Sequence, residues 1–128
     1  MDAVEVGGLR FRLDLTKPLY EQVLQQIRYA VARGEITLGT KIPSVRELAQ
    51  QLRINPNTVM RAYQELERDG LVETRRGQGT FITSSAETVE QVKKVLAAEA
   101  VQSFVDSLKA LGIDRKTAQM LVEEAEWE

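Results

Sequence analysis

The chain contains no cysteine and no histidine among its 128 residues. Without cysteine it can form no disulfide, no thiolate metal site and no thiol nucleophile. Without histidine it also lacks the commonest general base and the commonest metal ligand. Only carboxylates remain for acid–base chemistry, and no two of them stand in a convincing catalytic arrangement. We therefore expect neither an enzyme nor a bound metal or cofactor.

Long apolar runs are absent as well. The first 14 residues, MDAVEVGGLRFRLD, contain no basic leader region, and no later stretch approaches the roughly 20 apolar residues that cross a bilayer. These features predict a cytoplasmic protein with no membrane partner. The hydrophobic content of 43% suffices for a compact core.

The net charge is only −2, but the charges are unevenly distributed. Residues 1–82 hold 12 basic and 10 acidic side chains, whereas residues 83–128 hold 5 basic and 9 acidic ones. A mildly basic front and an acidic rear allow one end of the chain to face phosphate groups.

The first third of the chain predicts an extended segment followed by a helix. Residues 4–14 alternate between apolar and polar, which is typical of a short edge strand, here interrupted at two glycines. A helix then begins near Pro18 and ends near Gly34, with one apolar face. Residues 39–43 follow as a loop.

Two short amphipathic helices come next, separated by a break of three residues. Ser44 and Glu47 have the spacing of a capping box, so we expect a helix to begin there. The break is residues 53–55, and Asn55 is the N-cap of a second helix that ends at residues 69–70. Two amphipathic helices joined by so short a turn predict a helix-turn-helix motif.

Two β-prone runs, residues 71–75 and 80–83, follow the second helix directly. Glycines between them predict a β-hairpin, and a hairpin in this place is a wing. The expected fold is therefore mainly α with a small β-hairpin wing. We predict a winged helix-turn-helix domain at residues 1–83 and a helical segment at residues 84–128.

From Ala86 onward the pattern is purely helical. Apolar residues step by three or four as far as Leu111, and Asp114 caps a second helix that runs to about Glu126. One short partner helix cannot cover so long an apolar face, so we expect it to pack against a second copy of the chain. The predicted dimerisation residues are Val92, Leu96, Phe104, Leu108, Leu111 and Leu121.

The outer face of the second helix of the motif carries candidates for reading DNA. A helix in the major groove places its N-terminal residues against base edges, while nearby groups contact phosphates. Asn can bond an adenine edge, Arg a guanine edge, and Thr a phosphate or a thymine methyl. Arginines and glycines near a wing tip can approach the minor groove. The predicted DNA-binding residues are Arg46, Asn57, Thr58, Arg61, Arg75, Arg76, Gly77 and Gly79.

Several of these side chains also have a simpler interpretation. Arg61 and Glu65 have the spacing of an ion pair on a solvated helix face. In the same simpler interpretation, Asn57 and Thr58 only complete the N-cap of the helix. The acidic residues of the rear could hold a cation, although solvated helix faces explain them more simply. These are Glu99, Asp106, Glu123 and Glu124.

The sequence resembles the GntR family of bacterial transcription regulators. The segments that carry the resemblance are PLYEQ (18–22), GTKIPSVRELA (39–49), NPNTVMRAY (55–63), ERDGLV (67–72) and GQGTF (77–81). Together they extend over about half of the chain. Because so many motif elements match at the spacing of the family, the resemblance is highly specific.

This resemblance implies a winged helix-turn-helix that binds a palindromic operator as a homodimer. It assigns a phosphate contact to Arg46, the recognition-helix threonine to Thr58 and the wing-tip glycine to Gly77. Met60 stands where many relatives have arginine. The short helical rear resembles the YtrA-type branch, whose tail serves for dimerisation and whose members often control transporter operons.

We therefore expect a sequence-specific regulator, in the first place a repressor, that binds an inverted repeat in double-stranded DNA. The sequence identifies no small-molecule effector. A second interpretation is a winged-helix module for protein contact, with the long rear helix as a docking arm. Salt-dependent retention on heparin or non-specific duplex separates the two, because only a phosphate-binding face shows it.

Overall fold

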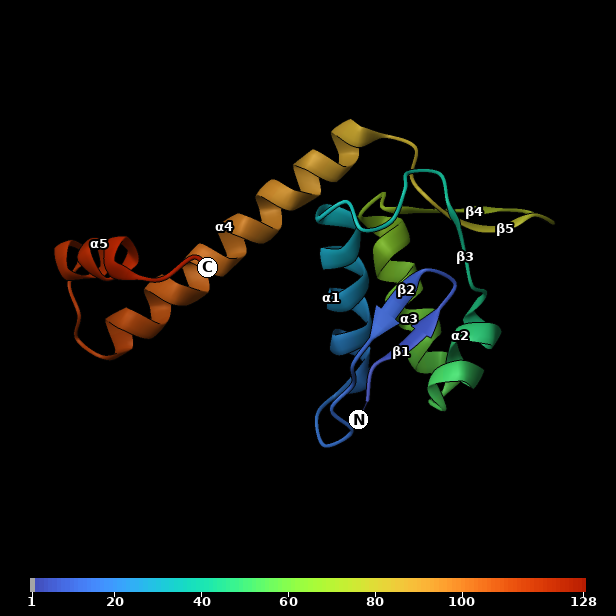
Figure 1. The fold of residues 1–128 in the computed structure, drawn as a ribbon, viewed down its shortest axis with the longest axis horizontal. Coiled ribbons are helices and arrows are strands. Elements are labelled where there is room, and N and C mark those ends of the chain that lie inside the picture. The colour runs from blue at the N-terminus through green and yellow to red at the C-terminus, as the bar shows by residue number, and fades with distance from the viewer. Residues whose placement is uncertain (1) are drawn as a thin grey trace. The chain divides into compact units, whose positions relative to one another are not determined.

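The computed structural model describes residues 2–128, which form five helices and five strands (Figure 1). The chain divides into two compact units, one that ends at Val92 and one that comprises Lys93–Glu128. The division lies inside helix α4 (Ala86–Ala110).

The chain starts with a β-hairpin. Strands β1 (Val4–Val6) and β2 (Leu9–Phe11) pair antiparallel, and the turn between them is Gly7–Gly8, with φ of 55° and 85°. Their alternation predicted one interrupted extended segment, whereas the structure reverses direction at the interruption. Glycine adopts such positive φ values without steric cost, which permits the reversal. Val6, Leu9 and Phe11 of the hairpin are buried in the core, and Val4 packs against it.

Helix α1 (Leu19–Ala32) supplies one face of that core. Its apolar stripe is buried, as helical spacing predicted, and it packs against α3 (Pro56–Arg68) and β2. Figure 1 shows α1 and α3 side by side. The helix ends where Gly34 adopts a φ of 77°, again as expected.

Helices α2 (Val45–Leu52) and α3 form the predicted helix-turn-helix. The buried residues of α3 lie at i, i+3, i+4 and i+7; on α2 the residue at i, Val45, is half-buried and those at i+3, i+4 and i+7 are buried. The two helices pack against each other. The buried residues are Leu48, Ala49 and Leu52 on α2, and Val59, Ala62, Tyr63 and Leu66 on α3.

The wing belongs to a sheet of three antiparallel strands in the order β3-β5-β4. Strands β4 (Val72–Arg75) and β5 (Gly79–Ile82) form the predicted hairpin, with Glu73 opposite Phe81. Strand β3 (Lys41–Ile42) joins the other edge of β5, although sequence reasoning placed these residues in a loop. Two residues are too few to show an alternating pattern.

Helix α4 begins in the first unit, where Val89 is buried and Val92 packs against the core. The second unit contains the rest of α4 and helix α5 (Arg115–Glu124), whose N-cap Asp114 accepts a hydrogen bond from the backbone N–H of Thr117 at 2.9 Å. In residues 2–128, no helix combines the length and the apolar character that crossing a bilayer requires.

Candidate nucleic-acid interface

Helix α2 begins with the predicted capping box. The Ser44 hydroxyl accepts from the backbone N–H of Glu47 at 3.1 Å, and the Ser44 N–H donates to Oε1 of Glu47 at 3.2 Å. These hydrogen bonds hold the pKa of the Glu47 carboxyl below its usual value. Arg46 lies between the two capping residues and is exposed. Within residues 2–128 it makes no ion pair, so its charge is available to a phosphate.

The turn between α2 and α3 is built on Arg53, which adopts the left-handed conformation (φ 57°, ψ 46°). The Ile54 N–H then returns to the carbonyl of Ala49 at 3.0 Å. Asn55 caps α3, since its side-chain oxygen accepts from the N–H of Asn57 at 2.8 Å.

The cap leaves the side chains of the first turn of α3 free. Asn57 takes part in capping only through its backbone N–H, and Thr58 likewise donates its N–H to the carbonyl of Asn55 at 3.0 Å. In the described part of the chain, neither side chain makes a hydrogen bond. The Asn57 side chain is exposed and that of Thr58 is half-buried. The simpler interpretation of these two residues as cap side chains therefore does not apply.

Arg61, one turn further along, is held by an aromatic ring. Its guanidinium carbon lies 3.8 Å from the ring centroid of Tyr20 in the first turn of α1. The ion pair considered with Glu65 is not formed, because Oε1 of Glu65 bonds Nη1 of Arg68 at 2.8 Å. Arg61 thus keeps an exposed charge on the outer face of α3.

The inner face of α3 is fixed by one buried hydrogen bond. The Tyr63 hydroxyl donates to the carbonyl of Pro43 at 2.7 Å, which joins α3 to the residue before the N-cap of α2. Burial raises the pKa of this hydroxyl. The bond fixes the rotation of α3 relative to the start of α2, and so determines which residues point outward.

The wing carries two arginines with different surroundings. Arg75 lies over the ring of Phe81, 4.2 Å from its centroid, and 3.5 Å from Oε2 of Glu73. Arg76 follows at the tip and is exposed, and the next residue, Gly77, has a φ of 76°. Arg75 is therefore restrained along the strand, while Arg76 projects at the turn.

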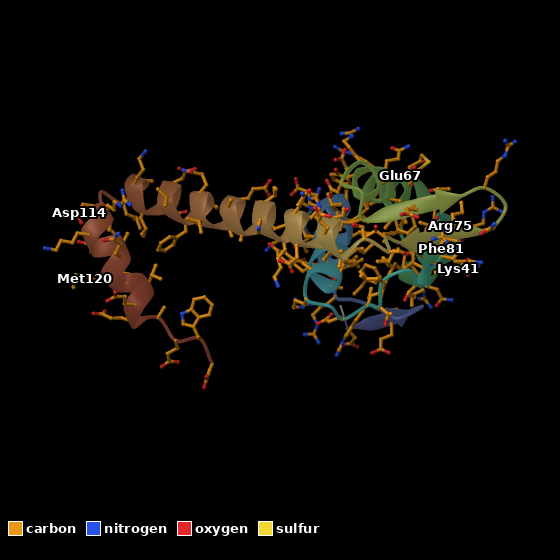
Figure 2. All side chains as sticks on the ribbon, turned by 90° about the horizontal axis from the view of Figure 1, so that it is seen from above. Lys41, Glu67, Arg75, Phe81, Asp114 and Met120 are labelled. Carbon is orange, nitrogen blue, oxygen red and sulfur yellow. The ribbon has the colours of Figure 1, made fainter. Side chains whose placement is uncertain are left out.

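The edge strand adds a basic residue that sequence reasoning did not select. Lys41 lies across Gly79, where a Cβ would stand only 2.7 Å from its Cε atom. Figure 2 labels Lys41 together with Arg75 and Phe81, near which it lies. Only the strand register, with Lys41 opposite Phe81, brings this cation to the wing. No signal within the loop-like run 39–43 could have indicated this position.

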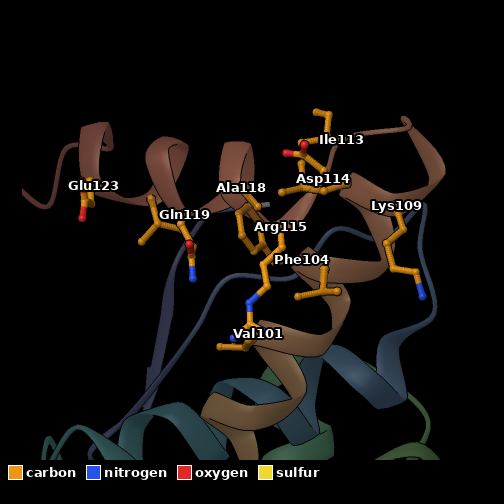
Figure 3. A pocket seen from close by; sticks show the side chains of 12 residues that line it. Val101, Phe104, Lys109, Ile113, Asp114, Arg115, Ala118, Gln119 and Glu123 are labelled. Atoms are coloured by element: carbon orange, nitrogen blue, oxygen red, sulfur yellow. The ribbon is translucent and has the colours of Figure 1, made fainter.

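The helical rear contains an apolar groove between α4 and α5 (Figure 3). Its volume is about 920 Å³, and its larger apolar lining residues are Val101, Phe104, Val105, Leu108, Ile113 and Val122. Of the predicted dimerisation residues, Phe104, Leu111 and Leu121 are 38%, 73% and 43% exposed, and Leu108 is half-buried. Val92 instead packs against the core of the first unit, and Leu96 is only 7% exposed.

The acidic residues of the rear do not form a cation site. Among residues 2–128, no three acidic side chains are grouped so that they could hold a metal ion. Asp106 accepts a hydrogen bond from the side chain of Gln102 at 2.9 Å on the surface of α4.

The motif and the wing together match a known protein family. Residues 19–82 match the model of the bacterial regulatory proteins of the gntR family, from the start of α1 to the end of β5. The chain belongs to the gntR family. It is therefore a DNA-binding transcriptional regulator, and the family expected from its motifs is confirmed.

Individual relatives of the gntR family extend the similarity into the helical rear. The chain is 50% identical over 101 residues to the HTH-type transcriptional regulator YhcF of Bacillus subtilis, covering 79% of this chain and 84% of that protein. It is 45% identical over 92 residues to the HTH-type transcriptional repressor YtrA of the same organism, covering 70% and 71%. The resemblance to YtrA-type regulators is thus confirmed.

A solved gntR-family structure has the same fold. The GntR family transcriptional regulator from Listeria monocytogenes superposes with a TM-score of 0.78 at 34% identity, covering 89% of this chain and all of that one. The predicted fold class, a winged helix-turn-helix with a helical C-terminal segment, is confirmed.

Proposed function

We propose that this gntR-family regulator is a homodimeric repressor that binds an inverted-repeat operator. The observation that carries the proposal is the outer face of α3, where the side chains of Asn57, Thr58 and Arg61 make no hydrogen bond among the described residues. Repression is suggested by the relative YtrA, which is named a repressor. The YtrA-type resemblance extends the proposal to a transporter operon as the regulated target.

The proposed DNA contacts fall into three groups according to where each residue lies. Arg46, in the first turn of α2, and Arg76, at the tip of the wing, are exposed cations suited to phosphates, which fix register without reading sequence. Asn57, Thr58 and Arg61 lie on the outer face of α3 and are suited to base edges. Arg75, Gly77 and Gly79 shape the wing for close approach to the minor groove.

We propose a second copy of the chain as the occupant of the apolar groove in the rear. Large apolar side chains are exposed on both α4 and α5 there, which is unusual for a surface in contact with water. Phe104 and Leu108 line the groove and would be covered in a dimer. Leu111 and Leu121 lie outside the groove, and the dimer would cover these exposed side chains as well. Two recognition helices about 34 Å apart then match two half-sites in successive major grooves.

The operator test uses selection from a library of duplexes with a fully random central segment, followed by mobility shift at moderate salt. The proposal expects enrichment of a palindrome and a preference over random duplex of about a thousandfold or more. Equal affinity for all duplexes would contradict specific binding. Binding to no duplex, with no retention on heparin, would favour a protein-docking module instead.

The dimer test measures mass in solution. Sedimentation equilibrium of the wild-type chain is expected to give twice the mass of 14.4 kDa, and Phe104→Lys with Val122→Lys, two exposed groove residues, is expected to give a monomer. Lys94→Glu, an exposed change elsewhere on α4, is the matched control and should leave the dimer intact. A wild-type monomer at concentrations well above those that bind DNA would contradict the dimer.

A further inference from the structure

Tyr20 holds the charged end of Arg61 on its ring. The distance of 3.8 Å from the guanidinium carbon to the ring centroid is well inside the range of about 6 Å for a cation–π contact. Tyr20 is half-buried and packs against the hydrophobic core, whereas Arg61 is exposed. The ring is therefore the partner that the core holds in place.

The ring restrains Arg61 without using its hydrogen-bond donors. A carboxylate partner would bind the N–H groups and reduce the charge, but Glu65, the nearest candidate on the helix, bonds Arg68. Across residues 2–128, the Arg61 guanidinium makes no ion pair and no hydrogen bond. Its planar set of donors remains free in a position that α1 determines.

We propose that Tyr20 is a positioning residue for base reading, which sets the orientation of the Arg61 guanidinium before DNA binds. The inference rests on the proposed function and deepens it. A long side chain that is already oriented loses less conformational entropy on binding, and the planar guanidinium is suited to bidentate recognition. The contact contributes to affinity only where Arg61 finds its matching base pair.

Two substitutions at position 20 distinguish the positioning role of Tyr20 from ordinary packing. Leucine at position 20 keeps an apolar contact with the core but offers no aromatic face. Phenylalanine keeps the face and loses only the hydroxyl. Tyr29, on the same helix and 43% exposed, provides a control tyrosine away from Arg61.

The experiment measures the affinity of Tyr20→Leu, Tyr20→Phe, Arg61→Ala and the double variant Tyr20→Leu/Arg61→Ala by fluorescence anisotropy. The probes are the operator selected by the wild-type protein, single-base-pair variants of it, and a random duplex. Tyr20→Leu is expected to weaken operator binding about fivefold per half-site, hence about 25-fold for a dimer on two half-sites. Its affinity for random duplex and its salt slope should match those of Tyr29→Leu.

Two further results are expected if the ring acts through Arg61. Tyr20→Phe should restore most of the discrimination, and the double variant should be no weaker than Arg61→Ala alone, because coupled residues are not additive. In the free wild-type protein and in its operator complex, NMR should show the Arg61 side-chain protons shifted upfield by the ring. This last measurement needs no variant that could fail to fold.

Each opposite outcome overturns the inference. Equal losses on every duplex would make Tyr20 a structural residue, and a Tyr20→Phe as weak as Tyr20→Leu would assign the effect to the hydroxyl. Additive losses in the double variant, or disappearance of the upfield shift on operator binding, would show that the ring does not act through Arg61. A wild-type protein that selects no operator contradicts the proposed function itself. A wild type that selects one, with Tyr20→Leu equally selective, contradicts only the role of Tyr20.

Discussion

Oδ2 of Asp69 lies 2.8 Å from Nε and 2.7 Å from Nη2 of Arg28. The pair joins the middle of α1 to the residue that ends α3, and its side chains are only 16% and 22% exposed. Together with the hydrogen bond from the Tyr63 hydroxyl to the Pro43 carbonyl, it fixes the recognition helix to the rest of the domain.

Arg28→Ala is expected to lower the free energy of unfolding by about 2 kcal/mol, between the values for exposed and fully buried pairs. The loss arises because Asp69 keeps a partly desolvated charge without a partner. Urea unfolding measures it. Arg33→Ala is the matched control, since the Arg33–Glu35 pair is 60% and 53% exposed and should contribute about 0.5 kcal/mol or less. Equal effects of the two variants would contradict the prediction.

Tyr63 should make the domain sensitive to alkali. Burial raises its pKa above the ordinary value of about 10, so the folded chain retains a proton that the unfolded chain releases. The stability from this group is complete below about pH 10 and falls as the pH rises toward the folded pKa. Urea unfolding at a series of alkaline pH values should show a shallower decline for Tyr63→Phe than for the wild type.

At neutral pH the Tyr63→Phe variant should be less stable by about 1 kcal/mol, because the Pro43 carbonyl loses its buried donor. Tyr29→Phe, on the surface, should behave as the wild type in both respects. If the stability of Tyr63→Phe fell with rising pH as steeply as that of the wild type, Tyr63 would not be the cause of the alkaline decline.

Glu47 should contribute to stability only in its ionised form. Hydrogen bonds from Ser44 lower its pKa in the folded state, so the contribution is present above the unfolded pKa near 4.3 and is lost as the pH falls through the folded value. Glu47→Gln can keep the capping geometry but cannot titrate. Its unfolding midpoint in urea should therefore change less between neutral and acidic pH than that of the wild type. An identical pH profile would show that the box is not formed in solution.

Arg46→Gln should weaken binding to every duplex by a similar factor. If each protomer loses one phosphate contact, the slope of log affinity against log salt should decrease by about 2 for a dimer. Asn57→Ala should leave that slope unchanged and relax discrimination at particular base pairs. Arg33→Gln, at the end of α1, serves as the charge control. Loss of discrimination at one base pair in Arg46→Gln would instead assign Arg46 to base reading.

Periodicity and capping residues predicted α1, α2, α3 and the wing, because these elements depend on neighbours within one or two turns. The capping box at Ser44 and the cap at Asn55 formed as expected. Strand β3 was missed because it depends on pairing with β5, which is distant in sequence.

The candidate site was predictable as a set of residues but not as a set of contacts. The outward position of Arg61 follows from the apolar stripe of α3, yet its partner lies on α1, 41 positions earlier. Tyr20 matched the buried stripe of α1 and showed no sign of a second role. Lys41 likewise reaches the wing only through tertiary structure.

The left-handed Arg53 has a consequence for the independence of the motif. Among the described residues it is the one non-glycine with positive φ, a conformation that costs a side-chain-bearing residue about 1–2 kcal/mol. The local sequence therefore disfavours the turn. Burial of α2 and α3 against α1 and the N-terminal hairpin β1–β2 must compensate for this cost. A synthetic peptide of residues 44–70 would not keep its two helices at this angle. Evolution or design could transplant this motif to another protein only together with the elements that cover it.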